Sequence, residues 1–222
     1  MPMDERTKET VRALLDRYGR GYVAEEAGFA VTNTAVGLFR LLCLSVLARD
    51  SVPSGPPVEA ARALFSRHWD SAPEMSKSDE GERAAVLGEA GYRSAQEASR
   101  RLGEATRMVM QRYDGDLQNL RKAADGDGQR LRRLLAEIPG MGEAGCAVFL
   151  RDAQMFWPEA GPFIDEHAAR AAGRLGLPAD AEELLTDVAR GQGEEMLSWL
   201  VGALALVDSR GEYDRITEHV HA

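Results

Sequence analysis

The stretch from Ile138 to His167 contains two features that could do chemistry together. A turn reading IPGMG lies between two helical patterns, and an isolated aspartate, Asp165, follows 23 residues after Gly142 in the sequence PFIDEH. Free backbone N–H groups at the start of a helix bind phosphate, and a fixed carboxylate can stabilise a positive charge or orient a water molecule. The pairing suggests a backbone clamp for a phosphate beside a reactive carboxylate.

The residues on both sides of the turn explain its shape. Apolar residues recur on one helical face over 131–138, and Pro139 ends that helix because proline has no backbone N–H. Gly140 and Gly142 can adopt positive φ, and a second helix over 143–150 begins with N–H groups that lack a partner within the helix. An ordinary two-glycine turn in a helical bundle is an equally good interpretation of the turn alone.

Two segments carry a family resemblance. IPGMGEAGCAVFL resembles the helix-hairpin-helix element of the DNA glycosylase superfamily that includes endonuclease III and the adenine and alkyl-base glycosylases. FWPEAGPFIDEHAARAAGRLGL is similar to the segment in which that family places an aspartate at the start of the next helix. The positions that match in order are Trp157, Pro158, Asp165, His167, Arg170, Arg174 and the run 175–177. Weaker similarity covers residues 38–52 and 87–102.

The resemblance implies an all-α, two-lobed glycosylase fold with DNA in a cleft between the lobes. One lobe would combine residues 1–31 with 165–222. The other would be a helical barrel over 32–164 that contains the helix-hairpin-helix at about 128–156. Apolar residues at helical spacing recur along the chain, and nothing reads as a run of alternating strands, which agrees with this fold class.

By resemblance, Asp165 is the catalytic residue of a base-excision DNA repair enzyme. From the sequence alone, an aspartate before a helix is also a good N-cap, and the two roles are compatible because a cap fixes the carboxylate. The resemblance further implies DNA contacts in the hairpin at Gly140, Met141, Gly142 and Gly145, and in two loops at Leu47, Arg49, Tyr92 and Arg93. For the loop residues, core packing and solvated charge are the alternative interpretations.

The lysine content indicates the type of reaction. Bifunctional family members use a lysine amine in the second hairpin helix to form a Schiff base and nick the strand. The matching position here is Ala144, and the three lysines of the chain all lie elsewhere, at Lys8, Lys77 and Lys122. The resemblance therefore implies a monofunctional glycosylase that leaves an abasic site and has no lyase activity.

Cysteine content bears on the cofactor. The chain has two cysteines, Cys43 and Cys146, both within apolar helical stretches, so we expect free thiols and no iron–sulfur cluster, which needs four cysteine ligands. The family instead suggests a monovalent cation, K⁺ or Na⁺, on the hairpin carbonyls of Ala136, Ile138 and Met141. No other cofactor is expected.

Charge and hydropathy limit the partners. The net charge of −9 opposes DNA binding, but residues 175–222 contribute −7 while 93–133 contribute +4, so the helices before the hairpin are basic. We expect a cytoplasmic monomer without a membrane span that associates with the bacterial nucleoid during repair. Its partner would be double-stranded DNA with a damaged or mismatched base. Two alternatives remain: a non-catalytic DNA-binding or damage-sensing protein of this fold, and a scaffold whose acidic C-terminal helices bind a basic partner.

Overall fold

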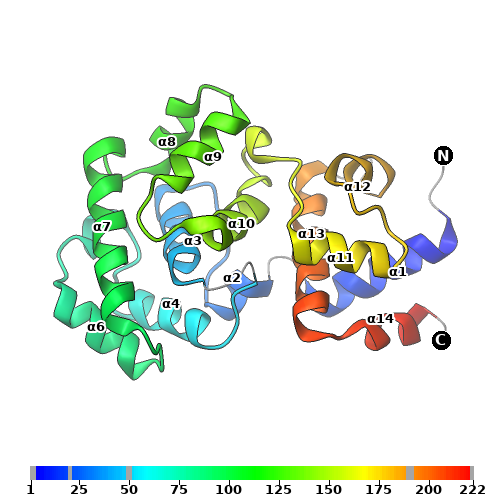
Figure 1. Ribbon diagram of the computed structural model, residues 1–222, viewed down its shortest axis with the longest axis horizontal. Helices are drawn as coiled ribbons and strands as arrows, with labels where there is room; N and C mark the ends of the chain where they lie inside the picture. Colours follow the sequence, from blue (N-terminus) through cyan, green and yellow to red (C-terminus); the bar gives the residue numbers. More distant parts are fainter. Residues whose placement is uncertain (1–3, 20–21, 49–51, 189–192, 221–222) are drawn as a thin grey trace. The chain divides into compact units, whose positions relative to one another are not determined.

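A computed structural model describes residues 4–19, 22–48, 52–188 and 193–220 (Figure 1). The chain divides into two compact units. The first unit joins the two ends of the chain, Met1–Tyr22 and Leu150–Ala222, and the second is the uninterrupted segment Val23–Phe149. Secondary structure in the described residues is helical throughout, without a strand.

Both unit boundaries differ from those expected from the sequence. The first unit ends at residue 22 rather than 31 and resumes at 150 rather than 165. The second difference has a clear cause, because the last turn of the second hairpin helix is bonded to later parts of the first unit. The backbone carbonyl of Arg151 accepts a hydrogen bond from Ser198 Oγ at 2.8 Å, and Gln154 bonds to the backbone of Phe163.

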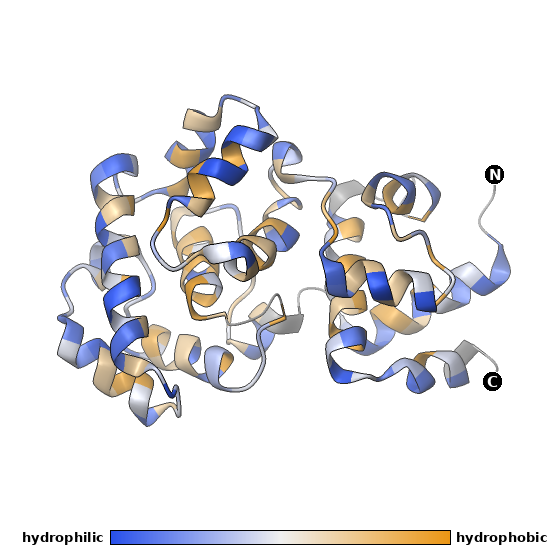
Figure 2. Cartoon of the chain, viewed as in Figure 1, coloured by the Kyte–Doolittle hydropathy of each residue, from blue (hydrophilic) through white to orange (hydrophobic). Residues whose placement is uncertain are grey.

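The second unit is built around a helix that is buried on all sides. Helix α3 packs against α4, α7 and α8, and Figure 2 shows it as mainly hydrophobic. Its residues from Leu38 to Leu47 are nearly all inaccessible, as expected for a helix without a polar face. Thr34 caps it by accepting the N–H of Gly37. The helices of this unit are α2 (Tyr22–Glu26, which begins at the boundary), α3 (Ala35–Leu47), α4 (Pro56–Ser66), α5 (Ala72–Met75), α6 (Glu80–Glu89), α7 (Ala95–Tyr113), α8 (Leu117–Ala124) and α9 (Gly128–Ala136).

Helices α9 and α10 form the expected hairpin. Helix α9 begins at its cap Asp127, which accepts the N–H groups of Gln129 and Arg130, and it buries Leu131 and Leu135 completely. Helix α10 (Gly142–Ala153) starts in the second unit and ends in the first.

The first unit has α13 at its centre. Helices α1, α11 and α12 pack against α13, and α1 also packs against α14. Three alanines of α11, Ala168, Ala171 and Ala172, are fully buried, which lets that helix lie close to α13. The elements are α1 (Glu5–Tyr18), a short 3₁₀ helix (Pro158–Ala160), α11 (Glu166–Arg174), α12 (Ala181–Asp187), α13 (Gly193–Arg210) and α14 (Tyr213–Val220). Among the described residues, no helix is both long and apolar enough to cross a membrane.

Candidate functional site

The backbone of the hairpin turn has the conformation that the sequence predicts, with positive φ at both glycines. Gly140 and Gly142 have φ of +86° and +46°, and the N–H of Met141 donates to the carbonyl of Ile138 at 3.1 Å. Gly140 also has no room for a side chain, because a Cβ there would lie 2.9 Å from Val46 Cγ1. Gly142 is exposed, and a Cβ there would meet nothing within 4 Å. The Gly142 side of the turn therefore faces outward.

Two hairpin residues expected to touch DNA also have packing roles. A Cβ at Gly145 would lie 2.7 Å from the carbonyl oxygen of Ser45, so this glycine lets α10 approach α3. Met141 is 1% exposed, and its side chain belongs to the core. Only the backbone of Met141 remains a candidate for contact with DNA.

A pocket of about 430 Å³ lies beside the turn. The hairpin residues 140–145 line it together with the end of α3 and the start of α7. Its charged residues are Glu97, Arg101 and Glu143, and Arg101 already donates to Glu97 at 2.8 Å. Glu143 is exposed in the first turn of α10, where it suits the helix dipole but repels a phosphate. This pocket is therefore a weaker anion site than the glycines alone suggest.

The loop residues expected to contact DNA also differ in exposure: two are buried and one is exposed. Leu47 is fully buried, so it cannot fill a gap in DNA, and the hydroxyl of Tyr92 donates to the Leu47 carbonyl at 2.8 Å. These contacts favour the alternative interpretation, core packing, for both residues: the Tyr92 hydroxyl connects the loop before α7 to the end of α3. Their contact with DNA stays a prediction. Arg93 is exposed and lines a pocket of about 250 Å³ with Pro53 and nearby prolines, so it remains available to a partner. Arg49 lies outside the described residues.

Asp165 occupies the N-cap of α11, as predicted, but its carboxylate is fully engaged. Oδ1 accepts the N–H groups of His167 and Ala168 at 3.0 and 3.2 Å. Oδ2 accepts Nε and Nη2 of Arg151 at 3.0 and 2.6 Å. The Asp165 side chain is 3% exposed and that of Arg151 4%. Four donors use the carboxylate's lone pairs, so in this conformation no acceptor position is left for a water molecule or a sugar.

Arg151 is the important residue that the sequence reasoning missed. It lies seven residues after Ala144, two turns further along the same face of α10. A guanidinium stays protonated, so Arg151 brings a permanent positive charge to Asp165 and cannot form a Schiff base. A signal was present in the sequence, because an arginine directly after the apolar run CAVFL is a charge that needs a buried partner.

A second polar cluster joins the first two turns of α11 to α13 and α14. Asp208 of α13 accepts hydrogen bonds from His167 Nδ1 at 2.6 Å, from Arg170 at 2.8 Å and from the Tyr213 hydroxyl. Burial works to raise the pKa of Asp208, but the hydrogen bonds from Tyr213 and His167 outweigh it and hold the pKa below its usual value. His167 and Arg170 are among the positions that carry the family resemblance, but the resemblance implies no chemical role for them.

The structure places both thiols. Cys43 is buried and Cys146 half-buried; both are free, and burial raises the pKa of each thiol, which suits packing rather than reactivity. The described residues contain no group of three or more His, Cys, Asp or Glu placed to hold a metal ion. A monovalent cation on the carbonyls of Ala136, Ile138 and Met141 stays a prediction.

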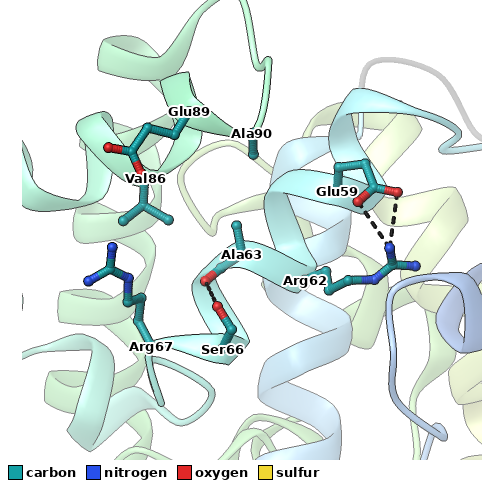
Figure 3. A pocket seen from close by; sticks show the side chains of 8 residues that line it. All are labelled: Glu59, Arg62, Ala63, Ser66, Arg67, Val86, Glu89 and Ala90. Atoms are coloured by element: carbon teal, nitrogen blue, oxygen red, sulfur yellow. Dashed lines mark hydrogen bonds and ion pairs between the residues drawn. The ribbon is translucent and has the colours of Figure 1, made fainter.

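A further pocket lies between α4 and α6, and none of the predicted site residues lines it. It measures about 570 Å³, and Figure 3 shows Arg67 and Glu89 beside Val86, with the paired Glu59 and Arg62 at the other end. Its mixed charge does not match a phosphate backbone, so we do not assign it to DNA binding.

The hairpin, the capped aspartate and the all-helical architecture define the fold of a DNA glycosylase. The chain is similar to the crystal structure of the H. pylori 3-methyladenine DNA glycosylase MagIII bound to 1,N6-ethenoadenine. The match has a TM-score of 0.57 and 12% identity, and it covers 94% of this chain and 99% of that one. No protein-family model and no curated protein sequence matches the chain. The all-α glycosylase fold predicted from the sequence is thus confirmed, while the DNA cleft between lobes stays a prediction.

Proposed function

We propose that the protein is a monofunctional DNA glycosylase that hydrolyses the N-glycosidic bond of a damaged or mismatched base. The observation that carries the proposal is Asp165, a carboxylate held rigidly at the N-terminus of α11, shortly after the hairpin helix, in a chain with a glycosylase fold. Its partner would be double-stranded DNA, bound by a monomer in the cytoplasm.

The chemistry follows from the geometry of a base stack. A base must be flipped out of the duplex, at a cost of a few kcal/mol, before its glycosidic bond can be reached. Bond cleavage develops positive charge on the sugar, which a fixed anion such as Asp165 stabilises. Because position 144 is alanine, no hairpin amine is present to attack the sugar, and the product would be an intact abasic strand.

A second candidate is a non-catalytic protein that binds damaged DNA. It is favoured by the Arg151–Asp165 pair, since a carboxylate that is buried and neutralised by a guanidinium contributes little to stabilising a sugar cation. In this case, Asp165 would serve only as a cap and as the partner of Arg151.

A panel of labelled duplexes tests the proposal. It would contain uracil, hypoxanthine, 1,N6-ethenoadenine, an alkylated purine and a mismatch, each incubated with excess protein. We expect one lesion to give strands that break only after alkali, and borohydride to trap no protein–DNA adduct. Breakage without alkali would contradict the monofunctional assignment. Selective binding of a lesion without base release would favour the second candidate.

A further inference from the structure

Gln154 holds the backbone that leads into Asp165. We propose that Gln154 is a positioning residue for the Asp165 carboxylate, which it constrains both through the preceding chain and through the guanidinium of Arg151. Gln154 directly follows the last residue of α10. This inference rests on the proposed glycosylase function, because its consequence is measured as a rate of base release.

The amide of Gln154 bonds to both backbone groups of Phe163. Its Oε1 accepts the N–H of Phe163 at 2.9 Å, and its Nε2 donates to the Phe163 carbonyl at 3.1 Å. The loop lies close to this side chain, since a Cβ at Gly161 would be 3.0 Å from Gln154 Oε1. Within the described part of the chain, residues 162–164 form no backbone–backbone hydrogen bond. The backbone just before Asp165 is therefore held by this one side chain.

The same amide holds the residue that pairs with Asp165. Nε2 of Gln154 also donates to the Arg151 carbonyl at 3.0 Å, and Ser198 Oγ of α13 donates to that carbonyl at 2.8 Å. This carbonyl belongs to the last turn of α10, where carbonyls lack a donor within the helix. The guanidinium of Arg151 in turn donates to Asp165 Oδ2. Gln154 thus constrains Asp165 from two directions.

Burial makes these hydrogen bonds important. Gln154 is inaccessible, and Ser198 and Arg151 are 2% and 4% exposed. A buried amide without partners is costly, so the favoured conformation of Gln154 is the one in which its oxygen and its nitrogen are both bonded. An apolar side chain at this position would leave the Phe163 N–H unpaired and release the loop. A reactive group that is misplaced by about 1 Å can lose on the order of 100-fold in rate.

Single-turnover base release by Gln154→Met, on the lesion found active with the wild type, measures the positioning role. Methionine has a similar length but cannot form the three hydrogen bonds of the amide. We expect the rate to fall about 100-fold. Affinity for the same duplex should stay unchanged, because Gln154 is inaccessible. Gln111→Met, the same substitution at an exposed glutamine of α7, is the matched control and should keep the wild-type rate.

A second control separates positioning from stability. Ile216→Val shortens a buried side chain of α14 in the same unit as Gln154. We expect it to lower the urea midpoint without slowing base release, at a temperature where circular dichroism shows every variant folded. If Ile216→Val slowed base release as much as Gln154→Met, the rate would depend on stability alone and the positioning role would be overturned.

Gln154→Glu provides a pH signature. Its ionised carboxylate can only accept, so it repels the carbonyls of Arg151 and Phe163, whereas the protonated form has one O–H donor and regains part of the bonding. Burial favours the protonated form. The ratio of the variant rate to the wild-type rate should therefore rise as the pH falls from about 8 to about 5. A ratio that does not change with pH would contradict the proposal.

The two hypotheses fail differently. If the wild type releases a base and folded Gln154→Met releases it equally fast, the positioning role is overturned and the glycosylase stands. If the wild type releases no base from any lesion, the glycosylase function fails, and the positioning role fails with it. Should Gln154→Met not fold, the pH dependence of Gln154→Glu decides, because this variant keeps the size of glutamine and, when protonated, one donor.

Discussion

Arg151 and Asp165 form a buried ion pair that links the second hairpin helix to the start of α11. Nε and Nη2 of one guanidinium donate to a single oxygen of the carboxylate, at 3.0 and 2.6 Å. The carboxamide of Asp165→Asn would remove the negative charge from this ion pair. A loss of activity in this variant would therefore report the loss of the pair as well as the loss of a catalytic anion.

A double-mutant cycle separates these effects. Arg151→Met should lower the free energy of unfolding by about 3–5 kcal/mol, because it leaves a buried carboxylate unpaired. Arg151→Met combined with Asp165→Asn should recover much of this loss, since both charges are gone. Urea denaturation of the four proteins measures it. Strictly additive losses would mean that the two side chains do not depend on each other.

The same four proteins test the role of Asp165 in base release. If the carboxylate stabilises the sugar cation, the double variant should be folded and bind DNA, yet release a base orders of magnitude more slowly than the wild type. Equal release by the double variant and the wild type would remove Asp165 from the mechanism.

Asp152, next to Arg151 on α10, should make stability depend on pH. Burial raises the pKa of its carboxyl to about 6, against an ordinary value of 3.8, although the charge of Arg151 opposes the shift. Ionisation is therefore harder in the folded state. Above pH 6 this costs the wild type up to about 3 kcal/mol of stability, and the cost disappears below the unfolded pKa.

Asp152→Asn should accordingly be more stable than the wild type at pH 7.5, and the difference should shrink to zero as the pH falls through 6 toward 3.8. Urea denaturation at four pH values gives the comparison, with Glu89→Gln, at an exposed carboxyl, as the control. A difference that stays constant with pH would show that the Asp152 carboxyl is not perturbed by folding.

Gly142 tests whether the hairpin touches DNA. Its positive φ disfavours a β-branched residue but is tolerated by asparagine. We expect Gly142→Val to weaken binding of all duplexes about equally, because a hairpin contacts backbone rather than bases, and Gly142→Asn to weaken it less. Fluorescence anisotropy at several salt concentrations measures the affinities. Unchanged affinity in folded Gly142→Val would leave the hairpin with a structural role alone.

Glu143 should oppose the same contact. Replacing it with glutamine removes an exposed negative charge from the first turn of α10 while keeping its size. We expect several-fold tighter duplex binding at low salt and no change at high salt, where the charge is screened. A gain that persists at high salt would have to come from something other than electrostatics.

Tyr92 and Arg93 should respond oppositely although they are adjacent. Tyr92→Phe removes the buried hydrogen bond to the Leu47 carbonyl and should cost about 1 kcal/mol of stability with DNA affinity unchanged. Arg93→Ala removes an exposed cation and should lower affinity with stability unchanged. Weaker DNA binding by a stable Tyr92→Phe would reinstate Tyr92 as a contact residue.

Local signals in the sequence predict the hairpin turn and the helix cap at Asp165. Pro139 and the two glycines place the hairpin turn, because proline and positive φ act on the backbone directly. The position of Asp165 before a helical pattern predicts its capping role in the same way.

Features that depend on distant residues could not be predicted. The pairing of Arg151 with Asp165 joins residues 14 apart, and that of His167 with Asp208 joins residues 41 apart, so no local pattern identifies the partner of either residue. Leu47 was expected to contact DNA because it lies in a segment that resembles a DNA-contacting loop of the family, with core packing as the alternative. Its burial depends on α3 being covered on every side, which is a property of tertiary packing.

The division of the chain into a contiguous unit and a unit made from both chain ends affects the order in which the two can fold during synthesis. Residues 23–149 are contiguous, so the second unit has all its helices once that stretch has left the ribosome. Helix α1 must wait for α13 and α14, and the bond from Tyr18 to Glu212 spans 194 residues. Until then its apolar residues, among them Val11 and Leu14, lack their packing partners. During synthesis, the second unit is therefore complete while α1 still lacks the helices against which it packs.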